Sequence, residues 1–365
     1  MGIDRRDPTP LYSQIIEDIK FQISTGQLAE GDKIDSQSNL AKYYNVSLIT
    51  VKKALVKLVD EGFLISRVGK VATVARQKTK VDYSKSPTIG LVLRDLNNPF
   101  FSRIVESVEK RATEKGYNIL LKSTLNQAEN ADSQIEQFSQ LGVNGFIIAS
   151  MAHVYHPSAM IRKLHDEEFP YIMVSYIENS NIYFIGTDHE LGGFMATEHL
   201  INLGYNKIGY INGEKGNLVG ELRKKGYHNA FAHHGRTVNN NFIYQLAFGG
   251  GWNDYESGYS IGQQICKQTE KPDAVFVYND LSALGFQKAV LECGLKIPDN
   301  IAIIGFDGIK RGVTASVPLT TIQQPTDKIG SMAIDLLSNR INGIQVMTRT
   351  ILKPQLIVRE SCGAK

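Results

Sequence analysis

Seven short apolar segments, separated by helix-length stretches, constrain the fold of this 365-residue chain more than any other feature. Each segment has the length and the content of branched and aromatic residues that are typical of a buried strand. Strands that alternate with helices along a chain form parallel sheets. The sequence therefore predicts an α/β architecture in which the repeated pattern builds two similar lobes. The segments lie at residues 88–95, 118–123, 145–150, 171–176, 207–213, 274–280 and 301–307.

The N-terminal part of the chain has a helical pattern instead. Between residues 10 and 24, apolar residues recur at every fourth position, which predicts a first helix. Ser36 can cap a short second helix, and Ser47 can cap a longer third helix that Gly62 ends. The residues of the first apolar stripe are Leu11, Ile15, Ile19 and Ile23.

A hairpin and a concentration of positive charge follow these helices. Apolar segments at 63–66 and 71–74 flank RVGK, with Gly69 at the tight turn, and predict a wing. Although the whole chain has a net charge of only +3, residues 42–80 hold nine basic and two acidic residues. This excess favours a surface that binds a polyanion. On charge alone, a solvated lysine-rich surface remains the alternative.

The third helix has two distinct faces. At 100° per residue, Val51, Ala54, Leu55 and Leu58 share one apolar face. The opposite face is basic with apolar insertions, and it suits the major groove because lysines neutralise phosphates and aliphatic groups contact thymine methyls. The alternative is an exposed helix with two stray aliphatic residues. The outward residues are Leu48, Ile49, Thr50, Lys52, Lys53, Val56 and Lys57.

Residues 8–74 resemble the winged helix-turn-helix domain of GntR-type regulators. The motifs are P-x-P-L-Y-x-Q from Pro8, G-x-L-x-x-G-D-K from Gly26 and V-S-x-x-T-V-x-x-A-L-x-x-L from Val46. The resemblance implies that residues 1–74 bind double-stranded DNA. Operator sequence does not carry over, because Asp35, Ser38, Leu48 and Val71 depart from the family pattern. The expected DNA-binding residues are Ser36, Ser47, Leu48, Ile49, Thr50, Lys52, Lys53, Gly69 and Lys70.

Polar and aromatic residues follow the strand-like segments of the larger part of the chain. Residues 75–87 are polar and predict a linker, and residues 88–358 form the predicted second domain. In open parallel sheets, ligands bind beyond the carboxyl ends of strands. DLNNPFF (95–101), Asn279 and Asp307 occupy such positions, and Arg223 and Trp252 lie in intervening stretches. Aromatic rings beside amides, carboxylates and a guanidinium suit a sugar.

The same part of the chain resembles LacI-type effector domains and periplasmic sugar-binding proteins. The matching stretches include IGLVLRDLNNPFF (89–101), AVFVYNDLSALG (274–285) and GLKIPDNIAIIGFD (294–307). The resemblance implies an effector cleft between two lobes, with lobe crossings near residues 184, 323 and 353. Residues 151–157 are candidates for selecting the ligand. The expected effector-binding residues are Asp95, Asn98, Phe100, Phe101, Arg223, Trp252, Asn279, Asp307 and Gln324.

The sequence gives little support to other functional classes. GGG at 249–251 lacks the spacing of a dinucleotide fingerprint, and GxxxxGK[ST] does not occur. The eight histidines, His233 and His234 included, lack metal-ligand spacing, and the three cysteines form no CxxC pair. We therefore expect no catalytic residue, cofactor or metal. With no run of ~18 apolar residues and no apolar leader after the first Met, we expect a cytoplasmic protein without a membrane segment.

Together these patterns predict a transcriptional regulator, expected to be a repressor, whose operator affinity a small molecule controls. Two-fold operators favour a homodimer. The effector is expected to close the cleft and shift the population of conformations. Because the arabinose-responsive repressor type joins the same two domains, a monosaccharide such as arabinose is the first hypothesis. A nucleobase or a phosphorylated metabolite is the alternative, and a second basic residue near Arg223, such as Lys224, would favour phosphate.

Overall fold

The computed structural model forms two compact units, residues 1–82 and 83–365, and each is described by itself. The described residues are 9–25, 27–66, 71–75, 86–125, 127, 129–149, 156–175, 178, 181–247 and 254–364. The predicted linker therefore lies mostly outside the described residues. So do the wing tip at 67–70, most of the stretch 151–157, and Trp252.

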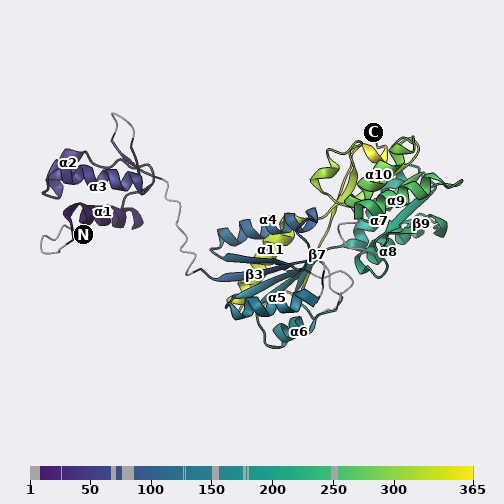
Figure 1. The fold of residues 1–365 in the computed structure, drawn as a ribbon, viewed down its shortest axis with the longest axis horizontal. Helices are drawn as coiled ribbons and strands as arrows, with labels where there is room; N and C mark the ends of the chain where they lie inside the picture. The colour runs from purple at the N-terminus through teal and green to yellow at the C-terminus, as the bar shows by residue number, and fades with distance from the viewer. Residues whose placement is uncertain are drawn as a thin grey trace. The chain divides into compact units, whose positions relative to one another are not determined.

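The first unit is a winged helix-turn-helix domain, as the sequence predicts (Figure 1). Its helices pack around one core that includes Ile15, Ile19, Leu40, Val51 and Leu58. The wing strands pair antiparallel, with Leu64 opposite Val74. The elements are α1 (Leu11–Ser24), α2 (Gln37–Tyr43), α3 (Leu48–Asp60), β1 (Leu64–Ile65) and β2 (Thr73–Val74).

Serine caps fix the starts of the second and third helices. The Oγ of Ser36 accepts a hydrogen bond from the backbone N–H of Asn39 at 3.2 Å. The Oγ of Ser47 accepts one from the N–H of Thr50 at 3.3 Å. Gly62, with φ of 78°, follows the end of α3 in a left-handed conformation that a residue with a Cβ adopts only with strain. Both predicted caps are confirmed.

The first lobe of the second unit is a parallel sheet with the strand order β13-β7-β6-β5-β3-β4. Helices α4 and α11 pack on one face, and α5 and α6 cover the other (Figure 1). The strands are β3 (Thr88–Leu93), β4 (Asn118–Ser123), β5 (Gly145–Ala149), β6 (Tyr171–Val174), β7 (Phe184–Thr187) and β13 (Arg349–Leu352). The helices are α4 (Pro99–Glu114), α5 (Glu129–Gln140), α6 (Ala159–Asp166) and α11 (Thr326–Ile341).

The second lobe repeats this design with the strand order β14-β12-β11-β10-β8-β9. All of these pairings are parallel except that of β14, which runs antiparallel to β12. Helices α7 and α8 pack on one face, and α9 and α10 on the other. The strands are β8 (Ile208–Asn212), β9 (Ile243–Gln245), β10 (Ala274–Val277), β11 (Ala302–Asp307), β12 (Thr320–Gln323) and β14 (Gln355–Ile357). The helices are α7 (His189–Asn202), α8 (Leu218–His233), α9 (Asp254–Cys266), α10 (Asp280–Glu292), η1 (Asn240–Phe242), η2 (Lys310–Gly312) and η3 (Glu360–Cys362).

The chain passes between the lobes after β7, after β12 and after β13. The crossings expected near residues 323 and 353 lie where β12 and β13 end. The crossing expected near residue 184 comes a few residues later, because β7 still belongs to the first lobe. Beyond residue 358, η3 packs against the second lobe, where the Oγ of Ser361 donates a hydrogen bond to the carbonyl of Ile303 at 2.6 Å.

Candidate functional site

The outward face of α3 is the candidate nucleic-acid interface of the first unit. Val51, Ala54 and Leu58 are buried, whereas the side chain of Ile49 on the opposite face is 80% exposed. Leu48, Val56, Lys52 and Lys53 are also exposed. The predicted division of this helix into a core face and a basic outward face is therefore confirmed.

The two central lysines of α3 lie on different sides of this interface. The Nζ of Lys53 lies 4.0 Å from the ring centroid of Tyr12, so the α1 side of the helix holds this charge in a cation–π contact. Lys52 lines a groove with Ser36 of the α2 cap and Val71 of the wing. Positive charge therefore flanks both sides of α3. This arrangement suits the two phosphate backbones that border a groove of duplex DNA. Gly69 and Lys70 lie outside the described residues.

The Oγ atoms of Ser47 and Thr50 lie 2.8 Å apart at the start of α3. Ser47 also caps the helix, so its hydroxyl is held at the N-terminal end of the exposed face. A helix N-terminus favours negative charge, because its first N–H groups have no intrahelical partner. Ser47 and Thr50 thus suit a phosphate at this end of α3.

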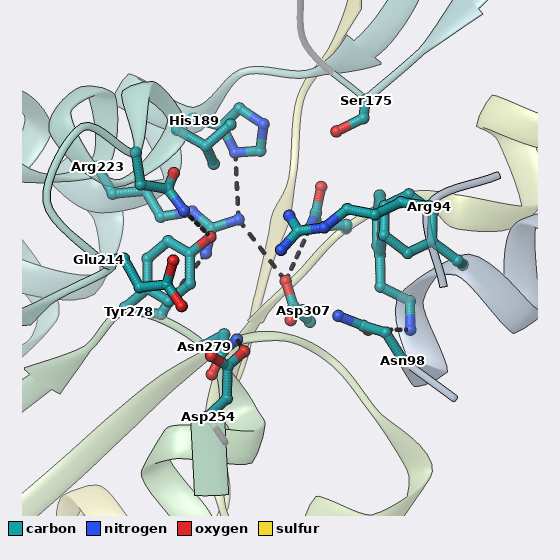
Figure 2. Close-up of a pocket in the computed structure, with 15 residues that line it drawn as sticks. Arg94, Asn98, Ser175, His189, Glu214, Arg223, Asp254, Tyr278, Asn279 and Asp307 are labelled. Carbon is teal, nitrogen blue, oxygen red and sulfur yellow. Dashed lines mark hydrogen bonds and ion pairs between the residues drawn. The ribbon is translucent and has the colours of Figure 1, made fainter. Parts of the chain in front are cut away.

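A pocket lies between the two lobes of the second unit, at the carboxyl ends of strands from both sheets (Figure 2). Its lining combines carboxylates, guanidinium groups, amides and aromatic rings. The first lobe contributes Arg94, Asn98, Phe100, Phe101 and Ser175. The second lobe and the crossing after β12 contribute His189, Glu214, Asn217, Val219, Arg223, Asp254, Tyr278, Asn279, Asp307 and Gln324.

Two helix caps place amides in this pocket. The Oδ1 of Asn98 accepts a hydrogen bond from the N–H of Phe100 at 2.9 Å and begins α4, which leaves its amide nitrogen toward the pocket centre (Figure 2). The Oδ1 of Asn279 accepts from the N–H of Ser282 at 2.9 Å and begins α10. Its Nδ2 donates to the Oδ2 of Asp254 at 2.7 Å. Capping therefore orients both side chains before any ligand binds.

Arg223 is the centre of a buried network in the second lobe. Its guanidinium donates to the backbone carbonyl of Tyr278 and stacks on the Phe306 ring, with 3.6 Å between its Cζ and the ring centroid. Its Nη2 lies 3.4 Å from the Nδ1 of His189 and 3.6 Å from the Oδ1 of Asp307. The side chain is only 3% exposed, so these contacts fix its position. The network prearranges a polar surface in the second lobe.

Asp307 ends β11 with φ of 121°, a left-handed conformation that a residue with a side chain rarely adopts. The Nε2 of Gln324 donates to its Oδ1 at 2.8 Å. Burial raises the pKa of Asp307 to about 6, although Arg223 and the hydrogen bond from Gln324 act in the opposite direction. At pH 7 the carboxyl is therefore mostly ionised and accepts hydrogen bonds.

Burial also shifts two neighbouring groups. It raises the pKa of Asp254, a shift that Asn279 and Arg94 oppose. Burial lowers the pKa of His189 well below its ordinary value, and the charge of Arg223 lowers it further. His189 is therefore neutral at pH 7, and its Nδ1 can accept a hydrogen bond from the guanidinium of Arg223.

The structure brings most of the predicted effector-binding residues together, and Asn98, Phe100, Phe101, Arg223, Asn279, Asp307 and Gln324 line the pocket. Asp95 does not line it. Its buried Oδ1 accepts hydrogen bonds from the backbone N–H and the Nδ2 of Asn97, so it shapes the turn before α4. Trp252 lies outside the described residues.

The sequence prediction missed several lining residues. Arg94 was within a recognised motif, and Tyr278 directly precedes Asn279, so both could have been found from their position at the end of a strand. Glu214 and Asn217 follow β8 and carried the same signal. The other missed residues are Ser175, His189, Val219 and Asp254.

Among the described residues, one group of side chains could hold a metal ion. Ligand atoms of Glu198, His233 and His234 lie within 4.8 Å of one another, and none of the three lines the pocket. In the described parts of the chain, no helix combines the length and the apolar character needed to cross a bilayer.

Comparisons with known proteins match both units. Residues 11–74 match the model of the family described as bacterial regulatory proteins, gntR family. Residues 197–362 match the model of the periplasmic binding protein-like domain.

Curated relatives and a solved structure agree with these matches. The arabinose metabolism transcriptional repressor of Geobacillus stearothermophilus is 30% identical, over 96% of this chain and 97% of its own length. The HTH-type transcriptional repressor PurR of Haemophilus influenzae is also 30% identical, over 88% of this chain and 97% of its own length. A periplasmic binding protein/LacI transcriptional regulator from Alkaliphilus metalliredigens, solved with D-xylulofuranose, is 29% identical with a TM-score of 0.65, covering 76% of this chain and 99% of that one.

These relatives share more than a fold with the chain, because the curated ones are repressors that it covers almost end to end. The chain therefore belongs to the LacI/GntR type of transcriptional repressors, with a GntR-family DNA-binding head and a periplasmic-binding-protein-like domain for a sugar or metabolite effector.

Proposed function

We propose that this chain is a cytoplasmic, homodimeric repressor whose operator affinity is controlled by a monosaccharide bound between the lobes. The observation that carries the proposal is the composition of the pocket (Figure 2). The carboxyl oxygens of Asp307 and Asp254 can accept hydrogen bonds from sugar hydroxyls, and the Asn98 amide can donate to them. Phe100 and Phe101 supply apolar surface for the C–H face of a sugar ring.

The charge of the pocket favours a neutral effector over a phosphorylated one. Its lining holds the carboxyls of Glu214, Asp254 and Asp307 and the guanidinium groups of Arg94 and Arg223. The guanidinium of Arg223 already contacts Asp307 and Tyr278. Lys224, which would have favoured phosphate, pairs with Glu221 at 3.5 Å and does not line the pocket. A phosphate would therefore meet three carboxyls against two guanidinium groups, one of which is already engaged.

The size of the pocket supports a small ligand. The cavity has a volume of about 70 Å³. This volume is the space open to the centre of a water-sized sphere, and one water needs roughly 10–15 Å³ of it. The cavity therefore holds about five waters.

A nucleobase is the second candidate effector. The rings of Phe100, Phe101 and Tyr278 can stack on a flat heterocycle, and the amides of Asn98 and Gln324 can pair with its polar edge. Repressors named PurR match the chain at the same 30% identity as the arabinose repressor, so overall similarity does not separate the two candidates.

Thermal unfolding of the full chain with different compounds tests the effector class. The panel contains L-arabinose, D-ribose, D-xylulose, hypoxanthine, guanine and fructose 1,6-bisphosphate. A ligand at ~100 times its Kd adds about 2.7 kcal/mol to the free energy of unfolding. We expect one free monosaccharide to raise the midpoint temperature. A rise only with hypoxanthine, guanine or the bisphosphate contradicts the sugar proposal.

Operator binding through α3 has a separate test. We expect Lys52→Ala/Lys53→Ala to weaken binding to operator and nonspecific duplexes alike and to reduce the salt slope by about 2, because each lysine neutralises about one phosphate. Lys115→Ala, a substitution in the second unit, is the control. An unchanged salt slope would show that α3 is not the DNA-contacting helix.

A further inference from the structure

The turn at residues 307–309 presents Asp307 to the pocket in an unusual backbone conformation. Asp307 and Gly308 have successive positive φ angles of 121° and 76°. A non-glycine residue keeps such a conformation only where its surroundings hold it. The contacts of this turn therefore determine where the Asp307 carboxyl lies.

The carboxyl of Asp280, fully buried at the start of α10, supplies those contacts. Its Oδ2 accepts a hydrogen bond from the N–H of Ile309 at 2.8 Å. Its Oδ1 lies 2.6 Å from the Oγ1 of Thr321, which in turn accepts a hydrogen bond from the N–H of Gly308 at 3.3 Å. Gly305 gives the carboxyl its space, since a Cβ there would lie 2.2 Å from Oδ1.

The same turn contacts the first lobe. The Nη1 of Arg103, on α4, donates a hydrogen bond to the carbonyl of Gly308 at 3.1 Å. Arg103 also lies 3.6 Å from the carboxylate of Asp327, which follows the crossing after β12. One short turn thus places the Asp307 carboxyl at the pocket and the Gly308 carbonyl against Arg103 of the first lobe.

We propose that Asp280 is a positioning residue of the effector site, which fixes the 307–309 turn so that Asp307 meets the effector and Gly308 meets Arg103. The inference rests on the proposed effector pocket. Asp280 does not line that pocket, so its effect on binding passes through the turn.

The protonation of Asp280 suggests a conservative substitution. Burial, together with the negative charge of Asp307, raises the pKa of Asp280 to about 8. Among the described residues, Asp307 on β11 is the ionisable group that acts on it, and its β12 partner Thr321 is neutral. A protonated carboxyl offers one donor and one carbonyl acceptor, and the amide of Asn offers the same pair. Asp280→Asn should therefore preserve the turn, and Asp280→Ala should release it.

The affinity test compares three variants of the full chain by calorimetric titration with L-arabinose, D-ribose, D-xylulose and hypoxanthine. We expect Asp280→Ala to weaken binding about tenfold or more, because it leaves the buried N–H of Ile309 without an acceptor. Asp280→Asn should bind within about threefold of the original chain and lose the pH dependence of affinity around pH 8, where Asp280 titrates. Gln287→Ala is the matched control, since it removes another buried polar side chain from α10, one that exchanges hydrogen bonds with the backbone of Val317.

Two results overturn the proposal: an Asp280→Ala affinity within about threefold of the original, or an equal loss in Gln287→Ala. If the original chain binds none of the four compounds, the proposed function fails separately. A crystal structure of Asp280→Ala then decides the positioning role without an effector. We expect Asp307 to leave its left-handed conformation and Gly308 to separate from Arg103, and an unchanged turn would refute the proposal.

Discussion

The two lobes of the second unit share one fold but contribute different chemistry to the pocket. The second lobe contributes a network centred on Arg223, in which Asp307, His189 and Tyr278 contact the same guanidinium. The first lobe contributes the end of β3 and the start of α4, where Asn98, Phe100 and Phe101 adjoin one another. We infer that the second lobe sets polar recognition, and that the first lobe completes the site as the cleft closes.

This difference between the lobes would make the affinity for the effector higher in the closed conformation than in the open one. A ligand shifts a conformational equilibrium only by its difference in affinity for the two conformations. In the proposed mechanism, contacts with the second lobe would form in open and closed forms alike, whereas contacts with Asn98 and Phe100 would form only when both lobes surround the ligand. Substitutions in the second lobe should therefore abolish binding, and those in the first lobe should weaken the coupling between binding and closure.

The largest expected effect is from Arg223→Ala. It removes the cation beside buried Asp307 and one hydrogen bond to the Tyr278 carbonyl, so we expect a loss of about 3–5 kcal/mol in the free energy of unfolding. Effector binding should fall below detection. Urea unfolding and calorimetric titration measure the two effects. Lys224→Ala changes the adjacent, partly exposed residue and should leave both nearly unchanged.

A smaller effect should appear when pH changes the charge of the second lobe. The pKa values of Asp307 and Asp280 are raised to about 6 and about 8, from 3.8, mainly by burial. A carboxyl whose pKa is raised by folding contributes stability that is fully present below the unfolded value and is lost as pH rises through the folded value. We therefore expect the free energy of unfolding to fall by about 2 kcal/mol or more between pH 5 and pH 9.

Urea unfolding at pH 5, 7 and 9 measures this fall. Asp280→Asn should remove the part of the fall between about pH 6 and pH 8, where Asp280 alone contributes, and leave the Asp307 part below about pH 6. A profile that does not change in this variant would show that Asp280 is not a source of the pH dependence.

The sequence predicted the buried strands better than the edge strands. β5, β8 and β10 lie buried in their sheets, and continuous apolar runs mark them. β9 and β14 are three residues long and only partly buried, so they have no comparable run. β12 has a polar sequence, TTIQ, and therefore lacks an apolar run. It can still be buried, because the hydroxyls of Thr320 and Thr321 form hydrogen bonds inside the lobe.

The pocket was predictable where a polar residue directly follows a predicted strand, as Asp307 does. It was less predictable where the direction of a side chain decides whether the residue lines the pocket. Arg94 and Asp95 are neighbours after β3, yet only Arg94 lines the pocket, because the Asp95 carboxyl accepts hydrogen bonds from the backbone N–H and the Nδ2 of Asn97. His189 follows β7, a strand that the sequence pattern did not indicate. Asp254 reaches the pocket through its hydrogen bond with Asn279, a contact between residues distant in sequence.

The smallest expected effect separates the two roles of Asn98 in the first lobe. Asn98→Asp keeps an oxygen that can cap α4, so the free energy of unfolding should change by less than about 0.5 kcal/mol, but it replaces the amide donor with an acceptor. Asn98→Ala also removes the cap and should cost about 1 kcal/mol. Both variants should weaken effector binding about fivefold to tenfold, because each loses one hydrogen bond to the ligand. Titration and urea unfolding of both variants show whether the first lobe contributes to affinity apart from stability; unchanged binding in Asn98→Asp would mean that the second lobe alone recognises the effector.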